Sequence, residues 1–189
     1  QAANALPADA TAEIWLIKDF SSAGKQYELT HALTLRGGFS GNERSADERN
    51  KNNRNSFQSA AFSSQTRIQG TLVFDSIAFT ENDGPRDIVN AIQWNTDAGE
   101  NTLALENCSL TGAFSVSSSA RLASVTIKDT VITDTEAVER KSALKLTCDT
   151  LHIENCSVPN DIRSNHSSIW DPHRYIFDIN RDTEPATSV

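Results

Sequence analysis

The chain has 189 residues, of which 38% are hydrophobic and 22% are charged, and this composition excludes a disordered chain and a membrane-spanning one. Its net charge of −8 argues against a nucleic-acid partner, because an acidic surface repels phosphates. The chain has no methionine, even at position 1, so we expect it to be a processed product or part of a longer protein.

The first third of the chain predicts two strands and a long loop. Residues 1–12 are interpreted as the remnant of an N-terminal cap. Residues 13–17 and 27–35 alternate apolar and polar side chains as strands do, with a turn between them. Residues 41–65 are polar and lack periodicity, which predicts a long surface loop.

Four segments in the middle of the chain read alike, at residues 71–80, 102–111, 124–133 and 150–159. Each has apolar residues at its second and fourth positions, then a polar pair, then apolar residues near its end. This alternation of period two predicts strands with one buried face. The predicted buried pairs are Leu72 and Phe74, Leu103 and Leu105, Val125 and Ile127, and Leu151 and Ile153.

A second, weaker set of alternating segments lies between the first, at residues 91–94, 113–116 and 143–146. Each repeating unit therefore supplies two short strands from the first set and one from the second. One such unit cannot bury its apolar face alone, but stacked units share a continuous core. The repeats predict an all-β fold, a single-stranded parallel β-helix (β-solenoid) of about five to six coils. An antiparallel sandwich remains the alternative.

The C-terminal end predicts a closing element and a tail. Residues 169–179 are expected to form a last coil or a cap, and residues 181–189 a flexible tail. Residues 1–180 are therefore expected to form a single domain.

The stretch from about residue 5 to residue 50 resembles the opening of many bacterial right-handed parallel β-helix proteins with a pectin-lyase-like fold. In those proteins a capping helix and an IWV-like strand precede a hydrophobic strand that ends in a GGF-x-G-x-E turn, often followed by an arginine. The matching residues here are Ile14, Trp15, Gly37, Gly38, Phe39, Gly41, Glu43 and Arg49.

The resemblance implies a right-handed β-helix more strongly than any activity. The family includes polysaccharide lyases and hydrolases, but also adhesins, autotransporter passengers and surface repeat proteins without catalysis. Its members are mostly secreted or surface-bound, so the resemblance implies an extracellular or cell-surface location. We interpret Gly37 and Gly38 as a turn that needs positive φ, because no phosphate-loop pattern follows them.

Stacking in register places equivalent residues in columns with neighbours about 4.8 Å apart. One outward column holds Asp75, Glu106, Lys128 and Glu154. Lyases of the family that the chain resembles hold calcium with carboxylates and remove a proton with a Lys or Arg. The resemblance therefore implies Lys128, Glu106 and Glu154 as the candidate catalytic residues. A surface charge ladder explains the same column, and no arginine is expected to join it. We therefore predict no catalytic residue and no cofactor, with calcium as the alternative.

Two further columns carry structural expectations. The bend column is Ser76, Asn107, Asp129 and Asn155, residue types that satisfy backbone groups and tolerate left-handed conformations. The inward column is Ile77, Cys108, Thr130 and Cys156. Its two cysteines are expected to lie two coils apart, too far for a disulfide, and Cys148 is expected to be a free thiol. No cysteine pair has the spacing of a metal site, so none is predicted.

Two groups of side chains are candidates for binding. Trp170, His173 and Tyr175 are close in sequence and suit stacking on sugar rings, but a cap over the end of the stack is the preferred interpretation. In the 41–65 loop, Arg44, Arg49 and Arg54 suit acidic glycans, or are a solvated face.

The sequence leaves three functions open. The preferred hypothesis is a non-catalytic extracellular module of a bacterial surface or secreted protein, adhesin-like or glycan-contacting, whose partner is a glycan or another cell-surface ligand. The alternative is a polysaccharide lyase or glycoside hydrolase of the pectin-lyase-like fold that acts on acidic polysaccharide. The third is a purely structural segment of a long repeat protein. No membrane insertion of this segment is expected.

Overall fold

The computed structural model describes twelve stretches of the chain. They are residues 11–18, 20–29, 31–58, 61–64, 70–80, 90–94, 102–111, 114–118, 122–133, 144–146, 148–157 and 177–179. Residues 1–10 of the predicted 1–12 cap, the aromatic group at 170–175 and the tail at 181–189 lie outside these stretches.

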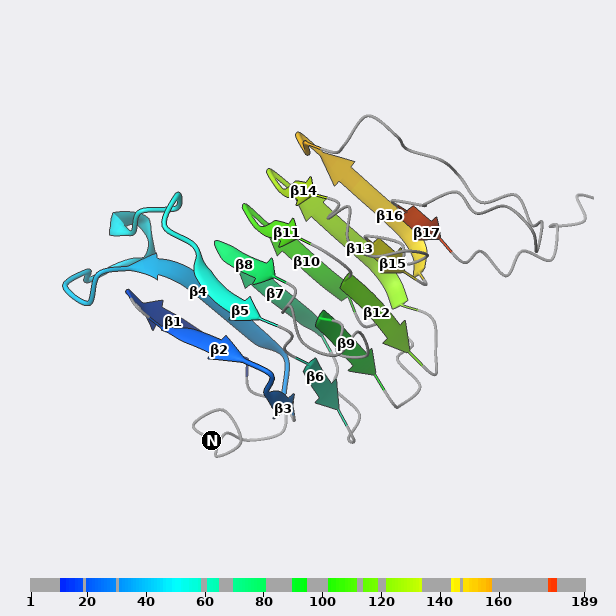
Figure 1. The fold of residues 1–189 in the computed structure, drawn as a ribbon, viewed down its shortest axis with the longest axis horizontal. Coiled ribbons are helices and arrows are strands. Elements are labelled where there is room, and N and C mark those ends of the chain that lie inside the picture. The colour runs from blue at the N-terminus through cyan, green and yellow to red at the C-terminus, as the bar shows by residue number, and fades with distance from the viewer. Residues whose placement is uncertain are drawn as a thin grey trace, which may run out of the picture.

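The described residues are nearly all strands, in three sheets whose strand pairs are all parallel (Figure 1). In order, the first sheet contains β1 (Ala12–Ile17), β4 (Leu33–Phe39), β7 (Thr71–Asp75), β10 (Thr102–Glu106), β13 (Leu122–Lys128) and β16 (Cys148–Glu154). The second contains β2 (Ser21–Ala23), β5 (Asn55–Gln58), β8 (Ile77–Thr80), β11 (Ser109–Thr111) and β14 (Val131–Thr133). The third contains β3 (Gln26–Glu28), β6 (Ala61–Ser64), β9 (Asn90–Trp94), β12 (Phe114–Ser118), β15 (Leu144–Leu146) and β17 (Phe177–Ile179). The one helix described is a short 3-10 turn, Ala46–Glu48.

The strands follow the chain in a fixed order. From β1 to β15 the chain enters the first, second and third sheets in turn and then returns to the first, so each sheet gains one strand per round. The four look-alike segments pair in the predicted register: Leu72 lies beside Leu103, Leu103 beside Val125, and Val125 beside Leu151. The all-β class and the parallel pairing of these segments are confirmed, and the antiparallel alternative is wrong.

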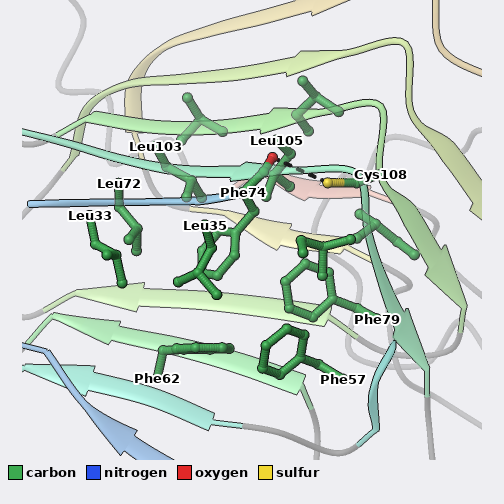
Figure 2. Close-up of a cluster of buried hydrophobic side chains, with 14 of the residues drawn as sticks. Leu33, Leu35, Phe57, Phe62, Leu72, Phe74, Phe79, Leu103, Leu105 and Cys108 are labelled. Atoms are coloured by element: carbon green, nitrogen blue, oxygen red, sulfur yellow. Dashed lines mark hydrogen bonds between the residues drawn. The ribbon is translucent and has the colours of Figure 1, made fainter. Parts of the chain in front are cut away.

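The core lies between the sheets and is filled by the alternate residues of each strand (Figure 2). In the first three look-alike segments, both residues of each predicted buried pair are at most 1% exposed. Aromatic side chains from different sheets meet at the N-terminal end of this core, where the ring of Phe62 lies edge-on to that of Phe74 with centroids 5.0 Å apart. The prediction fails for the fourth segment: Leu151 is half-buried and Ile153 is 42% exposed, because the described residues place no further strand of the first sheet beyond β16.

The bend column explains how the chain leaves the first sheet for the second. Ser76, Asn107, Asp129 and Asn155 all have φ between 50° and 59°, as their residue types predict. Side chains also join neighbouring bends, since the amide of Asn107 donates to the hydroxyl of Ser76 over 3.1 Å. Among the described residues, positive φ outside glycine occurs only in this column, so the backbone conformation repeats at the same position of each look-alike segment.

After three of the four bends, the next residue is a cysteine or threonine whose side chain donates to backbone carbonyls; after the first bend it is the buried Ile77. Cys108 Sγ donates to the carbonyl of Phe74 over 3.3 Å, and Thr130 Oγ1 donates to that of Lys128 over 2.9 Å. Burial raises the pKa of the Cys108 thiol to about 12, so this thiol stays protonated at neutral pH. All three cysteines are reduced, so no disulfide joins Cys108 and Cys156, as predicted.

The loop prediction for residues 41–65 is wrong over its second half. Residues 55–58 form β5 and residues 61–64 form β6, and the side chains of Phe57 and Phe62 are almost fully buried. The strands are only four residues long, too short for a period-two pattern to stand out among polar neighbours. The surface loop is therefore confined to residues 40–54. The strand predicted at 27–35 is likewise two strands, β3 and β4, on different sheets.

The register of the second set of segments could not be read from their alternation. Writing residues 91–94 above 113–116 places Ile92 at the position of Phe114, whereas β9 and β12 pair with Ile92 beside Val116. The shift is two residues, and an even shift keeps the same alternate residues on one side of a strand. The apolar pattern alone therefore could not separate the two registers.

The inward and outward assignment is testable with neighbouring residues of β13. Ile127 is fully buried, whereas Lys128 is half-exposed on the other face. Ile127→Asp is expected to lower the free energy of unfolding by at least about 4 kcal/mol, since it buries an unpaired charge. Lys128→Ala is expected to have little effect. Urea denaturation of both variants checks the assignment, and equal effects would contradict it.

Candidate functional site

The outward face of the first sheet carries a row of large polar side chains. Register pairing aligns one residue from each strand in the order Trp15, Arg36, Asp75, Glu106, Lys128 and Glu154. The four members predicted from the sequence are in place. The expectation that no arginine joins them is wrong, because Arg36 lies directly beside Asp75 on β4.

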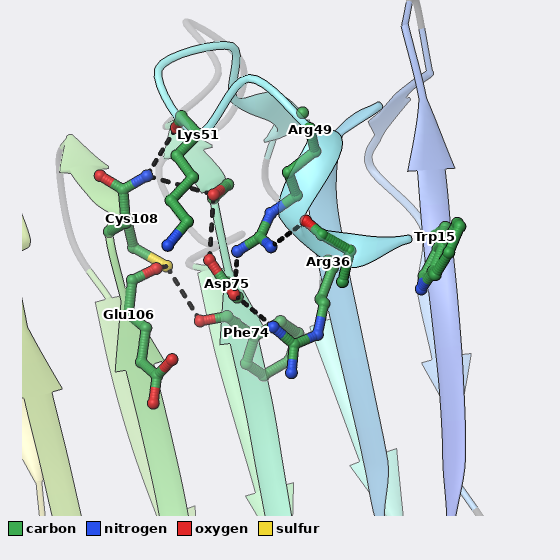
Figure 3. Close-up of polar contacts among 12 residues, drawn as sticks. Trp15, Arg36, Arg49, Lys51, Phe74, Asp75, Glu106 and Cys108 are labelled. Atoms are coloured by element: carbon green, nitrogen blue, oxygen red, sulfur yellow. Dashed lines mark hydrogen bonds and ion pairs between the residues drawn. The ribbon is translucent and has the colours of Figure 1, made fainter. Parts of the chain in front are cut away.

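Asp75 is buried between two arginines instead of facing solvent, which corrects its predicted exposure (Figure 3). Its Oδ2 atom accepts from Arg36 Nη1 over 3.0 Å and also from Arg49 Nη2. The side chains of Asp75 and Arg49 are only 5% and 3% exposed. Arg49 also donates to the carbonyl of Ala46 over 2.7 Å. This pair therefore ties the 40–54 loop to the first sheet.

The contacts of this pair continue into a closed ring that includes Trp15. The indole Nε1 donates to Glu13 Oε1 over 2.6 Å, and the same carboxylate oxygen lies 3.2 Å from Arg36 Nε. The Trp15 and Phe39 rings stack with centroids 4.5 Å apart and planes 7° from parallel. The Arg49 guanidinium lies 6.0 Å from the Phe39 centroid and completes the cycle. We call this set the arginine ring: Glu13, Trp15, Arg36, Phe39, Arg49 and Asp75.

The glycines of the sequence motif allow the backbone to approach this ring closely. A Cβ atom on Gly37 would lie 2.2 Å from the carbonyl oxygen of Ser76, so any side chain there forces β4 and β7 apart. Gly38 has φ +90°, and its amide donates to Asn55 Oδ1 over 3.1 Å. The prediction of positive φ is confirmed for Gly38, whereas Gly37 is required by close approach.

Glu43 stabilises the start of the 40–54 loop. Its carboxylate accepts from three successive amides, Ser40, Gly41 and Asn42, over 2.7 to 3.1 Å. These bonds, the Ser40 amide above all, lower the pKa of Glu43 to about 2. The motif glutamate is thus a cap for the loop backbone.

The loop arginines do not form the open basic surface that the sequence suggested. Arg49, which the sequence predicts as a binding residue, is buried in the arginine ring and paired with Asp75. Arg54 is half-buried and donates through Nε to the carbonyl of Asn107 over 2.6 Å, and through Nη2 to its Oδ1 over 2.9 Å. Arg44 is the exposed member of the three.

The candidate catalytic residues are poorly suited to proton abstraction. Lys128 Nζ lies 3.1 Å from Glu154 Oε1, and this hydrogen bond raises the pKa of Lys128 and lowers that of Glu154. Lys128 therefore stays protonated at neutral pH and lacks the lone pair that a general base needs. Glu106 makes no ion pair with any described residue, and no described group of three His, Cys, Asp or Glu side chains is arranged to hold a metal ion.

Trp15 is the residue of the site that sequence reasoning used only as a family marker. Its side chain is 39% exposed, and its stack on Phe39 and its bond to Glu13 fix its orientation. A tryptophan at an outward position of a strand was the available signal. The aromatic residues that were predicted to bind, Trp170, His173 and Tyr175, lie outside the described residues.

Comparisons with known proteins give no match: none was found among protein-family models, curated proteins or solved structures. Within the described residues no helix is long and apolar enough to cross a bilayer.

The contacts of the arginine ring predict a large loss of folding stability when the Asp75 carboxylate is removed. Asp75→Ala leaves two largely buried guanidinium groups without their shared counter-charge, which is expected to cost about 3–5 kcal/mol of unfolding free energy. Asp47→Ala, which removes an exposed carboxylate from the same loop, is the matched control and is expected to change stability by less than about 0.5 kcal/mol. Chemical denaturation measures both, and a fully stable Asp75→Ala protein would show that the ring is not a structural anchor.

The Glu43 cap predicts a pH dependence confined to the loop. The pKa of Glu43 is lower in the folded protein than the ordinary value of 4.5, so the carboxylate stabilises the loop above that value. This contribution is lost progressively as the pH falls towards 2. NMR titration of the Ser40 and Gly41 amides should report this transition in the native protein, and it should be absent in Glu43→Gln. A midpoint near 4.5 in the native protein would refute the cap.

Proposed function

We propose that this chain is a non-catalytic β-helix module of a secreted or surface protein, and that it binds glycans on the outward face of its first sheet. The fold part of the proposal is supported by the order of the strands. Three parallel sheets that the chain enters in constant rotation are what a helical winding of strands produces. The extracellular location is supported by the sequence resemblance to bacterial β-helix proteins.

The observation that carries the binding proposal is the fixed, exposed indole of Trp15. Aromatic faces stack on the C–H groups of sugar rings, and a platform that is already ordered loses little conformational entropy on binding. One side of Trp15 is stacked on Phe39, and its Nε1 is bonded to Glu13. Glu13 and Arg36, beside it on the same face, supply polar groups for sugar hydroxyls.

The lyase alternative has less support. It needs a basic side chain that accepts a proton, yet Arg36, Arg49 and Lys128 are each paired with a carboxylate. Asp75, the most buried acid of the row, is occupied by two guanidinium groups. Ion pairs of this kind hold a surface together and favour recognition over proton transfer.

A glycan array tests the proposal. The full chain is expected to bind at least one glycan, and Trp15→Leu is expected to weaken that binding at least tenfold while keeping an apolar contact with Phe39. Val131→Ala is the matched control. Val131 lies on the second sheet and is 39% exposed, as Trp15 is, so the Val131→Ala protein should bind the glycan as tightly as the native chain. Trp15→Leu binding as tightly as the native chain would refute the role of Trp15.

A second assay addresses the lyase alternative. Polygalacturonate and calcium are incubated with the protein, and the absorbance of unsaturated uronate products is followed. We expect no product. Product formation that disappears in Lys128→Ala would favour the lyase over the binding module.

A further inference from the structure

We infer that the ligand class of this face is a neutral glycan, not an acidic one. The inference rests on the proposed function and names its substrate class. Three features of the described residues carry it: the basic groups of the row and ring are paired with carboxylates, carboxylates outnumber basic groups there, and a row of uncharged side chains lies beside them.

The two arginines of the ring are already bound to protein groups. Arg36 contacts Asp75 and Glu13, and Arg49 contacts Asp75 and Ala46. A uronate beside either guanidinium would compete with a carboxylate that is covalently part of the protein and already aligned. The gain from a new charge pair would therefore be reduced by the weakening of the native one.

The remaining charge on the face repels anions. Along the outward row and its ring there are four carboxylates, Glu13, Asp75, Glu106 and Glu154, against three basic groups, Arg36, Arg49 and Lys128. Glu106, in the centre of the row, makes no ion pair with a described residue. The whole chain carries a net charge of −8, so its field adds to this repulsion.

The strands between Arg36 and Lys128 present small uncharged side chains beside the charged row. Register aligns Thr34, Val73, Ala104 and Thr126, each half-buried on the outward side. A further row begins with Thr71 and Thr102, whose hydroxyls are 2.6 Å apart. Hydroxyl and methyl groups at about 4.8 Å intervals match the mixed polar and apolar surface of a neutral sugar chain that lies across the strands.

Calorimetric titration of the full chain distinguishes the ligand classes. The probes are neutral hexasaccharides of glucose, mannose, xylose and galactose, together with hexagalacturonate as its free acid and as its methyl ester. The two galacturonate probes share one sugar backbone, and esterification removes the negative charge of each carboxyl group and adds a methyl group. Each titration is run at low and high NaCl concentration.

We expect at least one neutral probe to bind, with an affinity that changes less than twofold between the two salt concentrations. The free acid is expected to bind at least tenfold more weakly than the best neutral probe. Glu106→Gln should narrow this difference, because it removes the unpaired carboxylate at the centre of the row. The exposed carboxylate variant Asp47→Ala should not.

Two outcomes would overturn the inference in distinguishable ways. Free hexagalacturonate that binds as tightly as every neutral probe, with an affinity that falls in high salt, would refute the neutral class while leaving a glycan-binding module in place. The absence of binding to every probe, charged or neutral, would refute the proposed function together with the inference.

Discussion

The structure depends on one constraint, the in-register parallel stacking of short strands whose alternate residues fill a shared interior. Leu72, Leu103 and Val125 occupy equivalent positions on successive strands and are all buried. Because the side-chain period of a strand is two, this register also fixes which residues face outward. The outward row from Trp15 to Glu154 is aligned because the buried residues next to it in each strand fix the register of the strands. Any displacement of one strand by a single residue would exchange the two rows.

The arginine ring follows from that constraint. Arg36 and Asp75 are 39 positions apart in sequence but are neighbours in the first sheet, and Arg49 joins them because the 40–54 loop folds back over the same strands. The desolvation of Asp75 is offset by two charged donors. The ring also fixes Trp15, since Phe39 and Glu13 hold the indole from two sides. The residues that anchor the loop and those that fix the exposed indole are therefore parts of one network, in which both guanidinium groups are paired with protein carboxylates.

The sequence predicted the pairing of the four look-alike segments and little of the site. These segments have strong alternation, so their register, their bends and the buried pairs of the first three could be read directly. Phe57 and Phe62 were missed because four-residue strands in a polar stretch carry too few alternations to be recognised. The arginine ring was missed because its members come from three strands, β1, β4 and β7, and a loop, and no local pattern links Arg36 to Asp75. The motif residues Gly37, Gly38, Glu43 and Arg49 were identified, but their physical roles became clear only from the contacts they make.

Nuclear Overhauser spectroscopy of the isotopically labelled chain tests the stacking most directly. The account predicts methyl–methyl contacts between Leu103 and Val125 and between Leu105 and Ile127, together with amide-to-Hα contacts typical of parallel neighbours. Strong Hα–Hα contacts between β10 and β13, as antiparallel strands give, would contradict it. So would methyl contacts displaced by one residue, since the outward row and the proposed binding face would then not exist.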